Sequence, residues 1–170
     1  GVFHPVAVER LRLFGDRLNV AIERSHRLNG RLALFMLDLN GFKKINDSLG
    51  HDAGDQVLRE VSKNLSESVR SLDTLARLGG DEFTLIAEDL RDSHSVDRLQ
   101  DAIRDAVERP IMVNGQCMIV SASMGVAIYP DDRQDSAELL RIADQRMYSL
   151  KQRPAPHLQP VPDLETIPPA

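Results

Sequence analysis

Cysteine, tryptophan and long apolar runs are scarce or missing in this 170-residue chain. The one cysteine, Cys117, excludes an internal disulfide, and its apolar neighbours up to Val120 favour a small core residue over a nucleophile. No apolar run approaches the roughly 20 residues that a membrane-spanning helix needs, and the N-terminus has no signal-peptide pattern. We therefore expect a cytoplasmic segment that makes no contact with a membrane.

Positive charge is also in short supply. Lysine and arginine total 21 against 26 acidic residues, which gives a net charge of −5, and no basic block stands out. This balance argues against binding a nucleic-acid polymer through its phosphates. A single nucleotide stays compatible with it, because a metal cation can lie between the carboxylates of an acidic protein and the phosphates.

Apolar residues make up 42% of the chain, and their spacing predicts helices that alternate with strands. Hairpins at Gly79-Gly80 and Asn114-Gly115 require antiparallel neighbours. The order implies an α/β (α+β) sandwich in which helices flank a mixed, mostly antiparallel sheet of the ferredoxin-like or palm type. The expected helices cover about 6–27, 42–49, 52–69, 96–107 and 135–151, and the expected strands cover 32–37, 74–78, 83–87 and the runs on both sides of Asn114-Gly115, the second reaching Ile128.

Three segments are expected along the chain. Residues 1–28 form an N-terminal helix that leads into the domain, and residues 29–153 form the domain core. Residues 154–170 are rich in proline with little apolar periodicity, which predicts a linker or a disordered tail. Because the sequence starts abruptly at Gly1, we also expect further domains of a longer chain.

The first candidate for chemistry is Asp38, which follows six apolar residues at the end of the expected central strand. Open α/β sheets place ligands at strand ends, and a carboxylate buried there is costly unless a cation accompanies it. A helix-capping aspartate is the plainer alternative. An EF-hand calcium loop is disfavoured, because Gly41 comes at the fourth position of the loop and the loop follows a strand.

The second candidate is the acidic pair Asp81 and Glu82, which follows Gly79 and Gly80 at the tip of the expected hairpin. Two glycines allow positive φ and a close approach of a ligand to the backbone. If this hairpin lies beside the central strand, both acids converge with Asp38. Three oxygen donors then suit Mg²⁺ held partly by substrate phosphates, the arrangement of metal-assisted phosphoryl or nucleotidyl transfer. The alternative is a solvated turn.

Polar residues that could recognise a nucleotide follow on the next segments. Asn46, His51 and Asp55 could contact a purine, or they could be caps and turn formers around Gly50 and Gly54. Lys43 and Lys151 could contact phosphates, although most surface lysines do not. Arg70 and Asp73 are spaced as an ordinary surface ion pair.

An ordered series of motifs links these candidates between Leu11 and Lys151. Such a set over more than 100 residues is specific, and it resembles the GGDEF family, whose signature is the five-residue stretch at 79–83. The stretches at 73–77 and 129–132 resemble versions fused to a phosphodiesterase domain called EAL. The motifs are Asp38, Phe42-Lys43, Asn46-Asp47, Gly50-His51, Gly54-Asp55, Arg70-x-x-Asp73, Gly79-Gly80-Asp81-Glu82-Phe83, Ser123 to Ala127, Tyr129-Pro130, and Ala143-Asp144 with Met147-Tyr148.

The resemblance implies a fold related to the nucleotidyl cyclases and polymerase palms. It implies a diguanylate cyclase that condenses two GTP into cyclic di-GMP and releases two pyrophosphates, with two subunits facing each other as a homodimer. The cofactor would be Mg²⁺ or Mn²⁺.

The resemblance also implies a role for each candidate residue. The metal would be held by Asp38, the carbonyl of Leu39, Asp81 and Glu82, and Asp81 would help to activate the ribose 3′-hydroxyl. By the same resemblance, Asn46 and Asp55 would bind guanine with His51 nearby, Gly79, Gly80, Lys43 and Lys151 would meet the phosphates, and Arg70 and Asp73 would bind cyclic di-GMP as a feedback inhibitor.

Three departures from the family pattern keep alternatives open. Residues 3–11 do not supply the usual Asp-x-Leu-Thr-Gly-Leu-x-Asn-Arg stretch, and Asn40 stands where an acid is common. After Lys151 the usual Gly-Arg-Asn is absent, so a phosphate-binding arginine is missing at its usual place unless Arg153 substitutes. The alternatives are a weak or inactive module that binds GTP or cyclic di-GMP and regulates a neighbouring domain, and a purely structural or dimerisation module.

Overall fold

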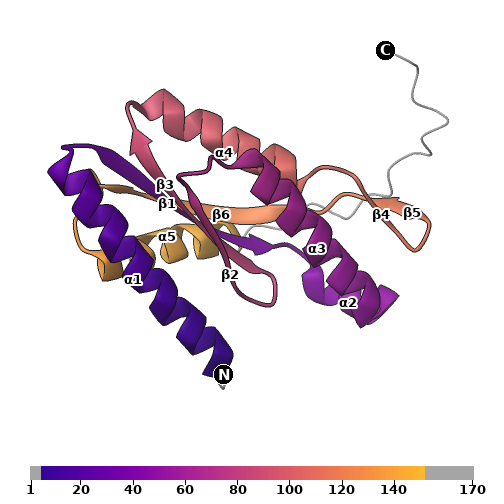
Figure 1. The fold of residues 1–170 in the computed structure, drawn as a ribbon. Coiled ribbons are helices and arrows are strands. Elements are labelled where there is room, and N and C mark those ends of the chain that lie inside the picture. The colour runs from indigo at the N-terminus through magenta and orange to yellow at the C-terminus, as the bar shows by residue number, and fades with distance from the viewer. Residues whose placement is uncertain (1–4, 152–170) are drawn as a thin grey trace, which may run out of the picture.

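Helices and strands alternate along residues 5–151, which are the part of the chain that this computed structural model describes, with side chains described for residues 10–150 (Figure 1). The tail predicted at 154–170 lies outside the described residues. None of the described helices is long and apolar enough to cross a membrane. The elements are α1 (Pro5–Arg27), β1 (Arg31–Leu39), α2 (Phe42–Leu49), α3 (His51–Ser68), β2 (Thr74–Gly79), β3 (Glu82–Leu90), α4 (Ser93–Val107), β4 (Ile111–Val113), β5 (Gln116–Met118), β6 (Ala122–Tyr129) and α5 (Ser136–Lys151).

The central sheet has the strand order β2-β3-β1-β6. All three ladders between these strands are antiparallel. The sequence had predicted a mixed, mostly antiparallel sheet, and this sheet contains no parallel pair among the described strands. The order strand, helices, two strands, helix, strand with β1 in the middle is the ferredoxin-like arrangement, which confirms the predicted fold class. Strands β4 and β5 form a separate hairpin beyond the end of this sheet (Figure 1).

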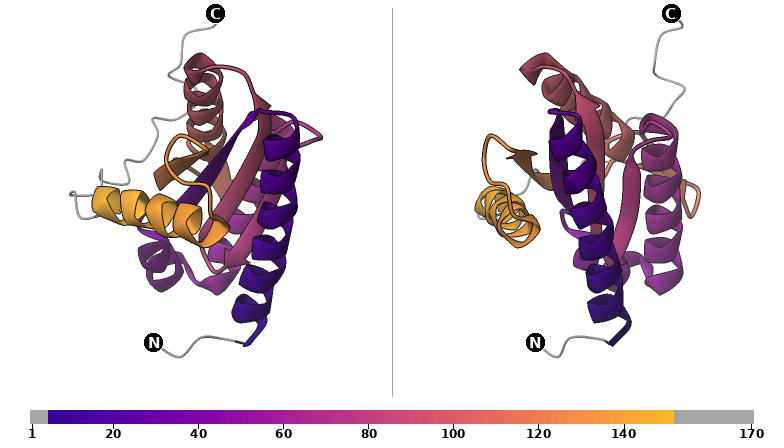
Figure 2. Two further views of the ribbon diagram at one scale, coloured as in Figure 1. Left: turned by 90° about the vertical axis from the view of Figure 1, so that its left-hand side faces the viewer. Right: turned by 60° about the vertical axis from the view of Figure 1, so that its left-hand side comes forward.

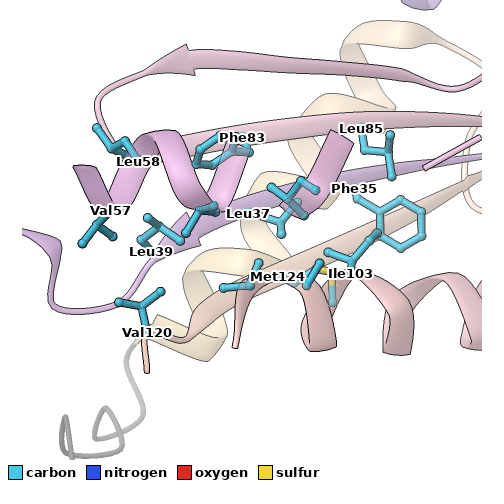
Figure 3. Close-up of a cluster of buried hydrophobic side chains, with 14 of the residues drawn as sticks. Phe35, Leu37, Leu39, Val57, Leu58, Phe83, Leu85, Ile103, Val120 and Met124 are labelled. Atoms are coloured by element: carbon cyan, nitrogen blue, oxygen red, sulfur yellow. The ribbon is translucent and has the colours of Figure 1, made fainter. Parts of the chain in front are cut away.

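Strand β1 occupies the centre because its side chains are buried on both faces from Leu32 to Leu39. Successive side chains alternate between the two faces of a strand. Phe35, Leu37 and Leu39 therefore join the larger core cluster, where they lie near side chains of other elements (Figure 3). Leu34 and Met36 join the second cluster on the other face. Asp38 continues the alternation on this second face.

Helices cover both faces of the sheet. Helices α3 and α4 cover the face of the larger cluster, and α1 and α5 cover the face of the second cluster. Figure 2 shows α3 and α5 on opposite sides of the strands. The buried helical side chains of the two cores are Ile45, Ala53, Val57, Leu58, Val61, Leu65, Val96, Ile103, Ala106 and Val107 on the first face, and Phe14, Leu18, Ala21, Leu139, Ile142, Ala143 and Met147 on the second.

Helix α5 lies unusually close to β6 at Gly125. A Cβ on Gly125 would lie 1.9 Å from the carbonyl oxygen of Ala143 and 2.5 Å from the backbone nitrogen of Met147. Only a glycine at this position permits the contact, because both obstructing atoms belong to the backbone. The glycine thereby fixes where α5 lies over the sheet.

Two expected elements begin or end elsewhere. The strand expected to run to Ile128 is divided between two sheets: β5 ends at Met118 in the hairpin with β4, and β6 starts at Ala122 beside β1. Val120, in the connection, is buried in the core at 1% exposure. Asp52 is not the N-cap of α3, since that helix already begins at His51. Gly50, with φ of 90°, changes the chain direction within a single residue and donates its N–H to the carbonyl of Asn46 at 2.9 Å.

The predicted turn chemistry is otherwise confirmed. Asn114 and Gly115 have φ of 52° and 77°, the pair of positive values that a type I′ hairpin requires. The carboxylate of Asp135 accepts the N–H of Glu138 at 3.2 Å, which caps α5 as expected. The reciprocal half of the capping box is not formed as expected, because the Glu138 carboxylate accepts from Arg141 at 2.7 Å instead.

Candidate functional site

The two strands that carry the candidate acids lie side by side in the sheet. In the antiparallel ladder between β1 and β3, Asp38 is the direct partner of Glu82. Directly opposed residues project from the same face, with Cβ atoms about 5 Å apart. Both carboxylates therefore lie on the face that α1 and α5 cover. Asp38 is only 7% exposed. The sequence had predicted a strand over 32–37 with Asp38 directly after it, whereas β1 continues to Leu39 and includes Asp38.

Asp81 joins this pair through the backbone. It lies in the two-residue turn between β2 and β3, and its carbonyl accepts the N–H of Leu39 at 3.1 Å. Gly80, before it, has φ of 46°, a left-handed value that favours glycine, and a Cβ there would meet nothing within 4 Å. The tip of the hairpin is thus open at Gly80 and anchored to β1 at Asp81.

A neutral hydrogen-bond network borders the acids on the side of β6. The Asn40 side chain donates to Ser121 Oγ at 3.0 Å and accepts from Ser123 Oγ at 2.8 Å. Ser123 is the ladder partner of Asp38 on β6. Asn40, which stands where the family often has an acid, is therefore fully engaged by two serines and adds no charge beside Asp38.

A cavity of about 680 Å³ opens directly beside the glycine hairpin. Residues 79–82 form one wall, and α5 forms another with Arg141 and Asp144. Leu11 of α1 and Met36 of β1 complete its apolar part. The Arg141 guanidinium pairs with Glu138 at 2.7 Å, and this contact holds the pKa of Glu138 below, and the pKa of Arg141 above, its ordinary value.

The polar residues expected to contact a base lie on the opposite layer. Asn46 is half-buried on α2, while His51 and Asp55 are exposed on the first turns of α3. Helix α3 covers the face away from the Asp38 and Glu82 carboxylates. A ligand that contacts these acids and also Asn46 or Asp55 therefore has to cross the end of β1. That crossing passes the residues between Leu39 and α2.

The N-terminus of α2 lies on this crossing. Its N-cap, Gly41, has φ of 70°, and no side chain caps the first N–H groups. Free N–H groups at a helix N-terminus favour an anion. Lys43 is exposed in the first turn of the same helix. Lys151 is the last residue of α5, and its side chain lies outside the described part of the structure.

Arg70 and Asp73 form a tighter unit than an ordinary surface ion pair. The Asp73 carboxylate accepts from the backbone N–H, Nε and Nη2 of Arg70, at 3.0, 3.2 and 2.9 Å. Arg70 Nη2 also donates to the carbonyl of Glu88 at 2.6 Å. Glu88 in turn binds Arg24 of α1 through two bonds of 2.9 Å. A cavity of about 300 Å³ adjoins Arg70, and Arg98 of α4 lies in its wall.

The donor set fits a magnesium ion that a substrate completes. Within residues 10–150, no three His, Cys, Asp or Glu side chains converge as a metal cluster. Mg²⁺ in phosphoryl-transfer sites uses one or two carboxylates together with phosphates and water. Asp38 and Glu82 offer two hard carboxylate oxygen donors on one face, and the backbone bond between Leu39 and Asp81 brings these two residues next to the pair.

Three residues of this region were not singled out as functional from the sequence. Arg141 had been assigned only to the last helix and Asp144 only to a family motif within it, and the helical spacing could not show that both line the cavity beside the glycines. Gly54 had been given no role beyond its place in a family motif, and it lies within α3 against Asn46. Its occurrence inside a helical pattern was the one available signal.

Comparison with known proteins adds independent findings. The family model described as "Diguanylate cyclase, GGDEF domain" matches residues 9–156. The bifunctional diguanylate cyclase/cyclic di-GMP phosphodiesterase MucR of Pseudomonas aeruginosa is 40% identical over 139 residues, which cover 82% of this chain and 20% of MucR. The cyclic di-GMP phosphodiesterase NbdA of the same organism is 41% identical over 126 residues, 74% of this chain and 16% of NbdA. The chain thus spans about a fifth or less of these relatives.

Solved structures agree with this result. The GGDEF domain of TpbB (YfiN) from Pseudomonas aeruginosa has a TM-score of 0.80 and 35% identity, with 84% of each chain covered. The GGDEF domain of DgcB from Caulobacter crescentus, solved in complex with c-di-GMP, has a TM-score of 0.74 and 26% identity. The alignment covers 83% of this chain and 84% of the DgcB domain.

Proposed function

The chain belongs to the GGDEF family, and on that premise we propose that it is a diguanylate cyclase. It condenses two GTP into cyclic di-GMP and releases two pyrophosphates. The observation that carries the proposal is the ladder pairing of Asp38 with Glu82 beside the open glycine turn. Glu82, the partner of Asp38, lines a cavity large enough for part of a nucleotide, which supports the proposal.

Each half-reaction is a nucleotidyl transfer. The 3′-oxygen of one GTP forms a bond to the α-phosphorus of the other, and the bond from that phosphorus to the bridging oxygen breaks to release pyrophosphate. The proton of the 3′-hydroxyl leaves to a base, and Asp81 at the hairpin tip is our candidate. Repeating the step in the opposite direction closes the ring.

Mg²⁺ or Mn²⁺, when bound, lowers the pKa of the hydroxyl and offsets charge on the α-phosphate. Asp38, Glu82 and Asp81 with the Leu39 carbonyl would hold it. One chain offers one such set of acids, whereas the reaction consumes two nucleotides. We therefore propose that two copies face each other, each with one GTP, so that positioning supplies much of the acceleration.

The rest of the nucleotide extends across the end of β1. The uncapped N-terminus of α2 and Lys43 meet phosphates, Gly79 and Gly80 leave room for them, and Asn46 and Asp55 bind guanine with His51 nearby. On α5, Lys151 is the expected phosphate contact. We add Arg141, because it lies in the wall of the cavity beside the glycines and can exchange its exposed pairing with Glu138 for a phosphate.

Product feedback is proposed at Arg70 and Asp73. Two bonds to the Asp73 carboxylate and one to the Glu88 carbonyl fix the Arg70 guanidinium beside a cavity whose wall also includes Arg98. Cyclic di-GMP offers phosphates and guanine edges that suit two arginines and one carboxylate. The related GGDEF domain of DgcB was solved in complex with c-di-GMP, which supports this ligand. A cytoplasmic location and further domains of a longer chain stay predictions.

A second candidate is a regulatory module that binds GTP or cyclic di-GMP without turnover. One observation favours it: NbdA, a relative at 41% identity, is named only as a phosphodiesterase. A domain like this one can therefore form part of a protein that is named for the opposite activity.

The test is product formation by the whole chain. The protein is first stripped of bound nucleotide, because an occupied feedback site would mask activity. It is then incubated with GTP and Mg²⁺ at high protein concentration, and nucleotides are separated by chromatography. Asp81→Asn removes the proposed base, and Asp97→Asn, an exposed acid on α4, is the matched control.

We expect cyclic di-GMP from the wild type and from Asp97→Asn, and none from Asp81→Asn. If the wild type leaves GTP intact but GTP or cyclic di-GMP raises its melting temperature, the regulatory module replaces the enzyme. If neither nucleotide has an effect, both candidates are wrong.

A further inference from the structure

The first turns of α3 contain a glycine whose missing side chain is replaced by an asparagine from α2. A Cβ on Gly54 would lie 1.8 Å from Oδ1 of Asn46 and 2.9 Å from its Cγ. It would also lie 3.3 Å from Cζ of Phe42. Real Cβ atoms essentially never come closer than 3.0 Å to such a neighbour. The Asn46 amide can occupy its position only because residue 54 has no side chain.

Backbone conformation does not explain the glycine. Gly54 is not among the residues with positive φ, and it lies inside α3, where alanine is the better helix former. Gly15 is also inside a helix, but a Cβ there would meet nothing within 4 Å. The contact with Asn46 therefore distinguishes position 54 from an ordinary helical glycine.

Packing alone holds the Asn46 amide. Among the residues that the structure describes, no hydrogen bond engages its side chain, and only its backbone carbonyl accepts, from Gly50. Asp55, the next residue after Gly54, is exposed, and no described Lys, Arg or His nitrogen lies within 4.0 Å of its carboxylate as an ion pair. Both side chains keep their donors and acceptors for a ligand, and Gly54 sets the position of one relative to the other.

On the premise of the proposed function, that Asn46 and Asp55 bind the guanine base, we propose that Gly54 is a positioning residue for base selection. It lets the Asn46 amide lie against α3 beside Asp55, so that both groups face one edge of the base. A methyl group at position 54 would force Asn46 into another rotamer. Asp55 would keep its place on α3, so the substitution would act through Asn46.

The test is Gly54→Ala in the whole chain, with affinities for GTP and ATP measured by calorimetry in the presence of Mg²⁺. We expect GTP affinity to fall roughly 10-fold, the effect of one or two lost hydrogen bonds. ATP affinity should stay within about twofold, because its base does not use the displaced amide. The turnover rate at saturating GTP should be unchanged, since the lost contact is made equally before and during the reaction. A loss of fold would instead lower both affinities.

A double-mutant cycle separates positioning from a local structural role. If Gly54 acts only through Asn46, then Gly54→Ala has no further effect on GTP affinity in an Asn46→Ala background. Gly15→Ala is the matched control and should leave both affinities unchanged. The proposal is overturned if the affinity losses of the two single variants multiply in the double variant. It is also overturned if Gly54→Ala keeps the wild-type ratio of GTP affinity to ATP affinity.

A spectroscopic measurement keeps this result distinct from failure of the proposed function. The side-chain NH₂ signals of Asn46 are identified in a ¹⁵N correlation spectrum by their loss in Asn46→Ala. Gly54→Ala should move these signals and Gly15→Ala should not; unmoved signals overturn the proposed displacement. A wild type with no preference for GTP over ATP overturns the base-binding premise itself, before any variant is made.

Discussion

Replacing Gly125 by alanine tests how strongly α5 is fixed to the sheet. The added Cβ would lie 1.9 Å from the Ala143 carbonyl oxygen, about 1.5 Å short of the 3.4 Å at which ordinary contact begins. A side chain could rotate away, but both obstructing groups are backbone atoms of α5. The helix must therefore move off β6 and weaken its contacts with the second core cluster.

Overpacking of a core costs typically 1–3 kcal/mol, and we expect the upper end, about 3 kcal/mol, because no side-chain rearrangement relieves the clash. For a chain of this size that lowers Tm by about 6–12 °C. The measurement is urea unfolding followed by circular dichroism, with Tm from a thermal scan. Gly15→Ala is the control, and it should be neutral or stabilising by up to about 1 kcal/mol.

The same displacement should reach the cavity beside the hairpin, because Arg141 and Asp144 move with α5. GTP affinity should fall in Gly125→Ala even at temperatures where the protein is fully folded. A Gly125→Ala protein whose free energy of unfolding lies within about 0.5 kcal/mol of the wild type would refute the reasoning, since α5 could then move off β6 without a measurable loss of stability.

Three further outcomes are expected. Arg141→Ala should weaken GTP binding by roughly 10-fold or more in calorimetry, the value of one charge-assisted hydrogen bond, and unchanged affinity would remove Arg141 from the site. Asp132→Asn should lower stability by about 1 kcal/mol at neutral pH, because Arg146 holds the pKa of Asp132 below its ordinary value through two bonds of 3.0 Å, while solvent screens the half-exposed guanidinium. This contribution to stability is fully present above the unfolded pKa of Asp132, near 4, and is lost as pH falls through its lower folded pKa. The unfolding free energies of the wild type and Asp132→Asn should therefore converge as the pH falls below about 4. A difference that persists at the lowest pH contradicts the assignment. Asp73→Ala should abolish inhibition by added cyclic di-GMP, because Arg70 loses the carboxylate that orients it, while initial rates of the stripped protein stay unchanged; inhibition at wild-type product concentrations would refute the feedback site.

Local sequence patterns determined most of the elements. Helical spacing located α1, α3, α4 and α5, and Asn114-Gly115 fixed a hairpin through its need for positive φ. The exceptions depend on contacts that are distant in sequence. The strand that was expected to be continuous is divided because its first part pairs with β4 and its second part pairs with β1, and only the packed structure shows these partners.

For the candidate site, the sequence supplied the chemical groups and the order of the motifs. Residue types and spacing alone singled out the acids at 38, 81 and 82, and family resemblance gave them roles. Register is different, because a one-residue slip moves every side chain to the other face. The pairing of β1 with β3 was needed to place Asp38 opposite Glu82.

Close approaches between distant segments could be decided only by the tertiary structure. A glycine in a sequence shows where a side chain is missing, but not which atom takes its place. At Gly125 that atom belongs to the backbone of α5, and at Gly54 it belongs to the Asn46 amide. The sequence thus determined which groups this protein has for binding a nucleotide, and packing determined where they lie, because van der Waals exclusion acts between atoms that the chain order does not bring together.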